Sequence, residues 1–348
     1  MKRISFIDIA RAIAIILIVF GHTIVHSSNC GIIFKLIYSF HVALFFIISG
    51  YVYKNKNNNY FDFIKNKFIR IMIPYFIWGL LFLIPYFLFG SDVASEVGVN
   101  SSFSIKQMLL NVLYGVGYNN ALKQNSALWF LPALFSMELV YYWIIKLSDK
   151  INNIYKVLIL IVLLIITIIC NYYLKFILPF GINTVLTMGI YFYIGYLLNN
   201  FDLLNNKKLF KCYYMIIIFI IGFICAWFNG SVQPIEYEYS NIFLSLGSGI
   251  GLSLVVIYLS YIIKENKILC YIGKSTMEIL IFHKLLVVIF QTKLGIISSL
   301  MTNSNIFIEL GISIVVVILS IAISLLGGYI ISKICPIVIG KRKSSLSK

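Results

Sequence analysis

Long apolar stretches constrain this chain more than any other feature of its sequence. About ten of them, each close to 20 residues long, centre near Ile15, Phe45, Leu81, Met137, Leu163, Gly189, Ile221, Leu254, Leu285 and Val317. A helix of that length spans the hydrocarbon core of a bilayer. Apolar residues fill 61% of the 348 positions and charged residues 11%, which is more hydrocarbon than a water-soluble fold can bury. The sequence predicts an all-α integral membrane protein with about ten transmembrane helices.

The basic residues predict how the chain is oriented. The formal net charge is +16, but Lys and Arg lie in short clusters between apolar stretches, which does not indicate a nucleic-acid partner. Alternate loops and both termini hold 21 of the 28 Lys and Arg residues, and the opposite loops hold five (Lys35, Lys106, Lys123, Lys175, Lys293). Cytoplasmic loops of membrane proteins collect positive charge, so both termini are predicted to be cytoplasmic. Abundant Asn, Lys, Ile and Tyr are typical of an AT-rich bacterial genome, so we expect a multipass protein of the inner (plasma) membrane.

The chain is predicted to form one domain. No internal repeat or soluble appendage is visible, so residues 1–340 are expected to be a single polytopic membrane domain and 341–348 a basic cytoplasmic tail. A polar break near 91–126 contains an amphipathic piece around Ile105–Leu113. Six scattered cysteines without Cys-x-x-Cys spacing support neither a disulfide framework nor a metal site. We expect no metal and no permanently bound cofactor.

The first apolar stretch contains ionisable residues. A charge at the centre of a membrane helix costs about 2.5–3.5 kcal/mol on insertion scales, so such residues are functional hypotheses by default. Asp8 and Arg11 are three positions apart and can pair on one helix face. Arg11 and His22 are eleven apart, almost three whole turns, so their side chains point the same way. Either residue alone is explained by an interfacial position, but the three in phase favour a function.

Five sequence blocks resemble one known family. The segment IDIARAIAIILIVFGH is similar to the opening helix of the type-3 membrane acyltransferases. These are multipass enzymes that O-acylate sugars on the far side of the membrane. Asp8, Arg11 and His22 match the signature of that opening helix. The other blocks are SFHVALFFIISGY, RIMIPYFIW, LWFLPALFSMEL and IGKSTMEILIFH, closest to the branch of fucose 4-O-acetylase-like proteins. The chain departs from that branch at Val42 and Ala43, where Met-Pro is usual, and at Lys284, which follows the late histidine.

The resemblance implies a reaction. An acetyl or other short acyl group would move from cytoplasmic acetyl-CoA to a hydroxyl of a cell-envelope glycan or its lipid-linked precursor. Acetyl-CoA would be a substrate and not a bound cofactor, and membrane lipids would surround the protein. His22 suits the general base or the acyl carrier, and Arg11, paired with Asp8, suits donor orientation. His41, at the start of the second stretch, is the next candidate for catalysis or acceptor binding, and a packed interfacial histidine explains it nearly as well. Three cations suit the donor phosphates, although positive-inside charge explains them equally well: Lys65, Lys67 and Arg70.

Later residues are candidates for acceptor binding or support. Trp129 and Phe130 can stack on a sugar ring, or belong to an interfacial aromatic belt. Glu138 is expected to pair with one of the cations. His283 and Glu278 lie five residues apart, so they should not share a helix face. Lys284 should line a cavity or pair with a carboxylate.

Three other functions fit parts of the sequence. A transporter or flippase for a glycan or lipid-linked sugar also needs many helices and buried charges, but neither an inverted repeat nor paired broken helices are visible. A non-catalytic component of polysaccharide export has no need for both Arg11 and His22. The other large class of membrane O-acyltransferases has a lone late histidine, which would correspond to His283 and leave the Arg11–His22 pair unexplained.

Overall fold

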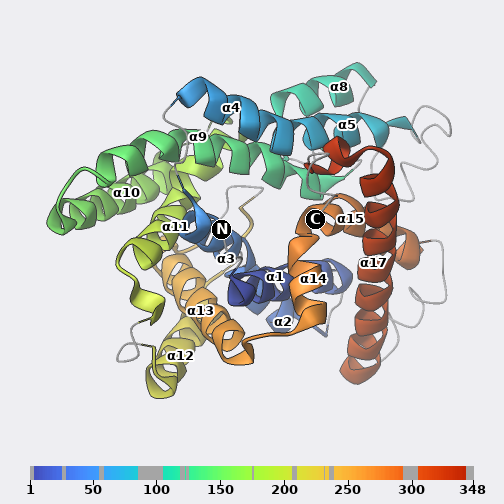
Figure 1. Cartoon of the computed structure of the whole chain (residues 1–348). Helices are drawn as coiled ribbons and strands as arrows, with labels where there is room; N and C mark the ends of the chain where they lie inside the picture. The colour runs from blue at the N-terminus through green and yellow to red at the C-terminus, as the bar shows by residue number, and fades with distance from the viewer. Residues whose placement is uncertain are drawn as a thin grey trace.

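A computed structural model describes residues 4–25, 29–54, 59–84, 105–117, 122, 125–174, 176–205, 210–230, 232–234, 239–292 and 305–341. The fold is all-helical, and no β-strand occurs in these ranges. Its helices are α1 (Ser5–Ile24), α2 (Gly31–Tyr38), α3 (His41–Val52), α4 (Tyr60–Lys67), α5 (Ile73–Leu81), α8 (Ile105–Tyr114), α9 (Phe130–Ser148), α10 (Asn153–Tyr173), α11 (Ile182–Asn200), α12 (Cys212–Phe228), α13 (Ile242–Ile263), α14 (Lys267–Lys274), α15 (Thr276–Thr292) and α17 (Ile306–Ile334) (Figure 1). The predicted fold class is confirmed, and the amphipathic piece near Ile105–Leu113 is α8.

Asparagines begin several of the helices. The first backbone N–H groups of a helix have no partner within it, and an Asn side chain can accept from them. Asn241 accepts from Phe243 and Leu244 at the start of α13, and Asn305 accepts from Ile308 at the start of α17. The sequence thus sets these helix starts locally, whatever packs around them.

Seven of the described helical segments are long and apolar enough to cross a membrane: Ser5–Ile24, Gly31–Val52, Ser126–Ser148, Asn153–Tyr173, Pro179–Asn200, Ile242–Ile263 and Ile306–Ile334. Gly31–Val52 comprises α2 and α3. The stretches near Ile221 and Leu285 form α12 and α15, which have 17 residues each. The stretch near Leu81 includes α5, which follows a π-helical turn at Phe68–Met72, and residues 85–104 lie outside the described part. The number ten and the sidedness stay predictions.

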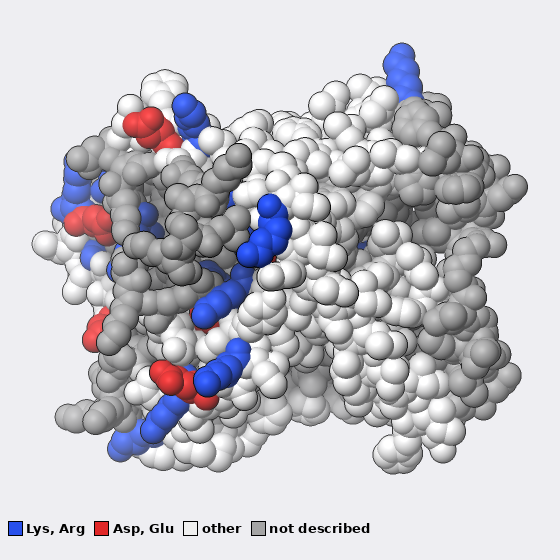
Figure 2. Space-filling model, turned by 45° about the vertical axis from the view of Figure 1, so that its right-hand side comes forward, with Lys and Arg blue, Asp and Glu red and all other residues white. Residues whose placement is uncertain are grey.

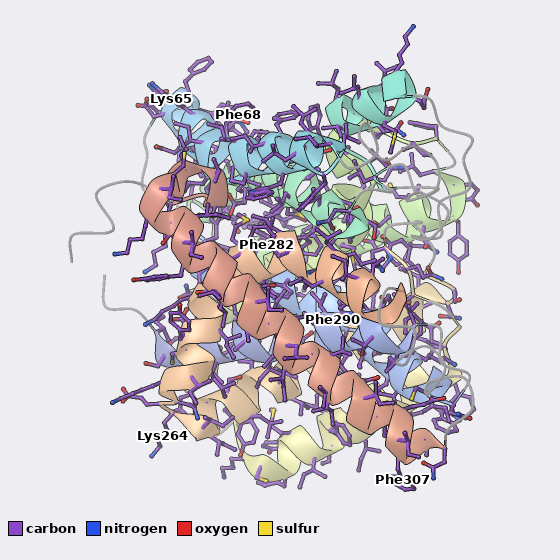
Figure 3. All side chains as sticks on the ribbon, turned by 90° about the vertical axis from the view of Figure 1, so that its right-hand side faces the viewer. Lys65, Phe68, Lys264, Phe282, Phe290 and Phe307 are labelled. Atoms are coloured by element: carbon purple, nitrogen blue, oxygen red, sulfur yellow. The ribbon has the colours of Figure 1, made fainter. Side chains whose placement is uncertain are left out.

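Helix α1 lies in the interior of the bundle, with α3, α13, α14, α15 and α17 packed around it (Figure 1). In an apolar 18-residue part of α1, 61% is buried inside the protein, and in the corresponding part of α10 the share is 11%. Helix α1 is therefore a core helix and α10 a peripheral one. Helix α17 runs obliquely across α15 (Figure 3). There Phe290 of α15 packs on a buried cluster that includes Val316 and Val317 of α17. The polar residues of the first apolar stretch are therefore enclosed by other helices.

Two helix crossings bring backbones into close contact through glycine. A Cβ at Gly273 of α14 would lie 1.8 Å from the carbonyl oxygen of Asp8 in α1. At the crossing of α3 and α11, a Cβ at Gly50 would lie 1.8 Å from the carbonyl oxygen of Phe192. Small residues allow this approach between membrane helices, where packing drives association. The contact at Gly273 sets how the α1 turn that carries Asp8 is placed and rotated against α14.

Charged side chains gather toward one end of the face drawn in Figure 2, and the rest of the described surface on that face is almost uncharged. Around the molecule as a whole, large apolar side chains are exposed on α10, α12 and α17, such as Val162, Ile221 and Leu326. Exposed apolar side chains on this scale fit a lipid environment. The basic end is the one at which α1 begins.

Candidate functional site

Helix α1 directs Arg11 and His22 into one cavity. Both line a hollow of about 380 Å³ between α1, α2, α3, α15 and the start of α9. The helical phase predicted from their spacing is confirmed. We call this hollow the histidine cavity because His22 and His41 both line it.

His22 lies between a tyrosine and a lysine. Its Nδ1 is 3.4 Å from the hydroxyl oxygen of Tyr38 and 3.4 Å from Nζ of Lys284. Both distances exceed the usual hydrogen-bond range of about 2.7–3.2 Å, so neither group blocks the nitrogen tightly. The ring of His22 is half-buried and faces the cavity. It is therefore open to a small hydroxyl group.

Two further histidines flank this site. Nδ1 of His41 lies 2.9 Å from the carbonyl oxygen of Ile37, and Nδ1 of His283 lies 2.7 Å from that of Ile279. A carbonyl only accepts, so each Nδ1 carries the hydrogen and each Nε2 has the free electron pair of a neutral ring. His41 lines the cavity, whereas His283 is fully buried behind His22, with ring centroids 5.4 Å apart.

Aromatic side chains form another wall of the histidine cavity. Trp129 ends a short 3-10 turn, Ser126–Trp129, and Phe130 begins α9. Phe130 packs against Phe46 with ring centroids 5.4 Å apart. Both Trp129 and Phe130 line the cavity, and their contact with a sugar ring stays a prediction.

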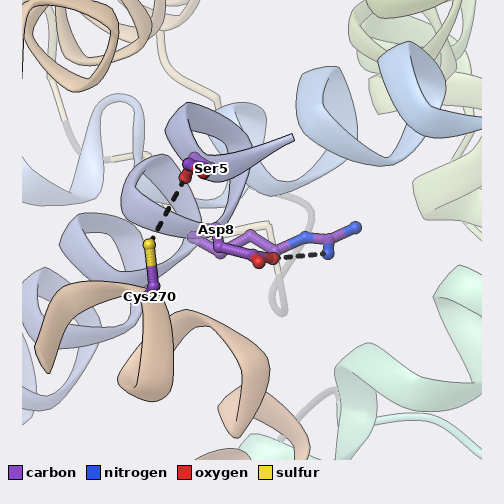
Figure 4. Close-up of polar contacts among 4 residues, drawn as sticks. Ser5, Asp8 and Cys270 are labelled. Carbon is purple, nitrogen blue, oxygen red and sulfur yellow. Dashed lines mark hydrogen bonds and ion pairs between the residues drawn. The ribbon is translucent and has the colours of Figure 1, made fainter. Parts of the chain in front are cut away.

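Arg11 forms the predicted ion pair. Its guanidinium lies 3.7 Å from the carboxylate of Asp8, which is 2% exposed (Figure 4). Helix α14 packs on this turn of α1, and the Cys270 thiol donates to the carbonyl oxygen of Ser5 at 3.8 Å (Figure 4). A buried carboxylate needs a partner, and this pairing orients the guanidinium toward the cavity.

A second hollow of about 820 Å³ opens at the basic end of the bundle. Six of the described cations line it, against two carboxylates: Arg11, Lys54, Lys67, Arg70, Lys274 and Lys341, with Glu138 and Glu278. We call it the basic cavity. It shares four lining residues with the histidine cavity: Arg11, Ser49, Leu134 and Met277. The two cavities therefore meet at Arg11.

Both glutamates of the basic cavity are paired. Glu138 of α9 forms an ion pair with Lys67, which confirms that Glu138 pairs with a cation. Glu278 of α15 forms one with Lys341. Because each carboxylate offsets one lysine, an excess of positive charge is left at Arg70, Lys54 and Lys274.

The structure separates several residues that the sequence grouped. Lys65 is exposed on α4 (Figure 3) and lines neither cavity. Lys67 and Arg70 line the basic one. Glu278 lines the basic cavity and His283 lies beside His22, so the two occupy different sites, as their spacing predicted. Lys284 lines the histidine cavity, the first of its two predicted positions.

Sequence reasoning missed some lining residues. The sequence pattern gives no signal for Tyr38, which stands sixteen residues after His22 and three before His41. Lys341 was assigned to the tail that begins at 341, yet it lies in the basic cavity; the rest of that tail is outside the described residues. In the described ranges, no group of three His, Cys, Asp or Glu side chains could hold a metal ion.

Comparison with known proteins identifies one relationship. A family model described as an acyltransferase domain matches residues 4–331, nearly the whole chain. No curated protein and no solved structure matches it.

Proposed function

Because the chain belongs to the type-3 acyltransferase family, it is a membrane acyltransferase, and we propose that it moves an acetyl or other short acyl group from cytoplasmic acyl-CoA to a hydroxyl of a cell-envelope glycan or its lipid-linked precursor. The observation that carries this proposal is the junction of two unlike cavities at Arg11. One cavity suits the donor and the other suits the acceptor, and the acyl arm of the donor can pass from the first to the second at Arg11.

The basic cavity suits an acyl-CoA. The donor is large and carries several phosphate charges, which Arg and Lys bind by charge-assisted hydrogen bonds. Arg70, Lys54 and Lys274 offer such donors in a hollow of about 820 Å³. If both termini are cytoplasmic, as the loop charges predict, this cavity opens to the compartment that holds acyl-CoA. The thioester arm would then extend past Arg11 toward His22.

The histidine cavity suits the acceptor. Trp129 and Phe130 offer aromatic faces that can pack on the apolar face of a sugar ring. His22 is in reach of a hydroxyl group there, and a neutral imidazole can take its proton as the oxygen attacks the thioester carbonyl. His41, which also lines this cavity, is positioned to bind another hydroxyl of the acceptor. A glycan reaching this cavity from the outer side would need no passage through the membrane.

The test is acyl transfer in vesicles. The purified protein is reconstituted with an envelope glycan inside and labelled acetyl-CoA outside, and labelled glycan is measured. His22→Ala should lower the rate by about 10²–10⁴-fold, the usual contribution of a general base. Thr23→Val is the matched control, because Thr23 is the next residue of α1, lines neither cavity, and donates to the carbonyl oxygen of Phe20.

The outcomes separate the candidate functions. Full activity of His22→Ala, inserted in the membrane like the wild type, would overturn the proposed mechanism. Movement of unlabelled glycan across the vesicle membrane without any acyl donor would instead indicate a transporter.

A further inference from the structure

Acyl transfer places a negative charge that the residues assigned so far do not stabilise. Attack on a thioester carbonyl turns the carbonyl oxygen into an oxyanion, and enzymes stabilise it with donors fixed at that position. Arg11 lies about three turns along α1 from His22, roughly 16 Å of rise, so it is not beside the attacking oxygen. The stabilising group has to lie within a few ångströms of the base.

Lys284 meets that requirement. Its Nζ lies 3.4 Å from Nδ1 of His22, the nitrogen that would take the proton. The oxyanion forms one bond away from the attacked carbon, so a cation this close to the base is within reach of the oxyanion. Tyr38, at 3.4 Å on the same nitrogen, offers an O–H donor from α2. Helix α15 thus brings a cation to the base that α1 provides.

The charge of Lys284 has no carboxylate to balance it within the cavity. The described residues that line the histidine cavity include two cations, Arg11 and Lys284, and neither Asp nor Glu. Arg11 is paired with Asp8. In surroundings of low dielectric constant, a cation without an opposite charge favours an anion that forms beside it.

On this basis, which rests on the proposed function, we propose that Lys284 is a catalytic residue that stabilises the tetrahedral oxyanion. The hydroxyl oxygen bonds to the carbonyl carbon, its proton passes to Nδ1 of His22, and the carbonyl electron pair moves to the oxygen beside Lys284. When that pair returns, the carbon–sulfur bond breaks and the thiolate leaves with the proton from His22. Lys284 keeps its own protons throughout.

His283 serves a different purpose in this arrangement. It is the residue before Lys284, is fully buried and does not line the cavity, so it cannot touch substrate. Its ring lies behind that of His22 at 5.4 Å between centroids. His283 is therefore a positioning residue, and α15 supplies one side chain behind the base and the next one in front of it.

The experiment measures kcat and KM in the vesicle assay for Lys284→Met, Lys284→Arg and Lys284→Ala. Lys284→Met should lower kcat by about 10²–10³-fold, with KM for both substrates within twofold of the wild type. Lys284→Arg keeps the charge and should recover at least a tenth of the wild-type kcat. Alternatively, added propylammonium should restore kcat of Lys284→Ala, and a sodium salt at equal ionic strength, the control, should not. Lys106→Met is the matched control, since Lys106 is exposed on α8 and lines neither cavity.

Other results overturn the inference. A raised KM for an anionic acceptor with kcat unchanged would mean that Lys284 attracts the acceptor. A loss of kcat that neither Arg nor propylammonium relieves, in variants that insert normally, would mean a structural role. Failure of the proposed function looks different, because then the wild type and His22→Ala would both lack acyl transfer.

Discussion

The basic cavity and the histidine cavity touch at Arg11, yet they differ in size, charge and wall. The basic cavity has about twice the volume of the other, and six of its lining residues are lysine or arginine from five separate segments. The histidine cavity is lined by aromatic and aliphatic side chains around a few polar groups on α1, α2, α3 and α15. The first arrangement suits a large anion that arrives and leaves, and the second suits chemistry with little water.

The difference also separates binding from catalysis. Charges in the wide cavity can hold the donor equally in the ground state and the transition state, so their loss should raise KM. Groups beside His22 meet charge that exists only during the reaction, so their loss should lower kcat. The following predictions test this division from the largest expected effect to the smallest.

Gly273→Ala should disrupt both cavities together. The added Cβ would lie 1.8 Å from the carbonyl oxygen of Asp8, and backbone cannot yield as a side chain can. We expect a loss of about 3 kcal/mol or more, measured as a lower midpoint of thermal unfolding in detergent. Gly311→Ala on α17 is the control, because a Cβ there meets nothing within 4 Å. Equal midpoints for the two variants would contradict the close contact of α1 and α14.

Arg11→Lys should lower acyl transfer by about 10²-fold, the scale of loss when a bound substrate is misplaced by about 1 Å. Lysine keeps the charge but lacks the planar fork that pairs with Asp8 and faces both cavities. Arg70→Lys is the matched control in the wider cavity, where a point charge suffices, and should change kcat/KM less than threefold. Similar losses in the two variants would show that Arg11 is only one more phosphate contact.

The double variant Arg70→Met, Lys274→Met should raise KM for acyl-CoA about tenfold and leave kcat unchanged. Hydrogen bonds to charged groups contribute about 1.5–3 kcal/mol, and dissolved ions screen them in a cavity that is open to solvent. The effect should shrink as salt is added. Lys65→Met is the informative comparison, since Lys65 is exposed outside the basic cavity; we expect its KM to change less than twofold. A larger change would extend the donor site along α4.

Trp129→Ala should raise KM for the glycan about threefold to tenfold and leave KM for acyl-CoA unchanged, since an aromatic contact contributes roughly 0.5–1.5 kcal/mol. Trp143→Ala is the control on the same part of the chain, because Trp143 is exposed on α9 and lines neither cavity. A raised KM for acyl-CoA in Trp129→Ala would place the donor, not the acceptor, against this wall.

Sequence periodicity settled the part of the site that lies on one helix. Arg11 and His22 point into one cavity because eleven residues make almost three turns, and Asp8 pairs with Arg11 because three residues separate them. The length and apolarity of the stretches settled the all-helical fold. These features depend on distances along the chain, which helix geometry converts directly into directions in space.

Only the tertiary structure decided which helices meet. Helices α1 and α10 are both long and apolar, yet the buried share of an apolar 18-residue part is 61% in α1 and 11% in α10. Lipid is as apolar as a protein interior, so hydrophobicity does not mark the packed face of a membrane helix. Lys284 and His283 reach His22 across some 260 positions of chain, and Lys67 lines the basic cavity where Lys65 does not. Those placements depend on close helix contacts such as the one at Gly273, whose geometry comes from shape and not from composition.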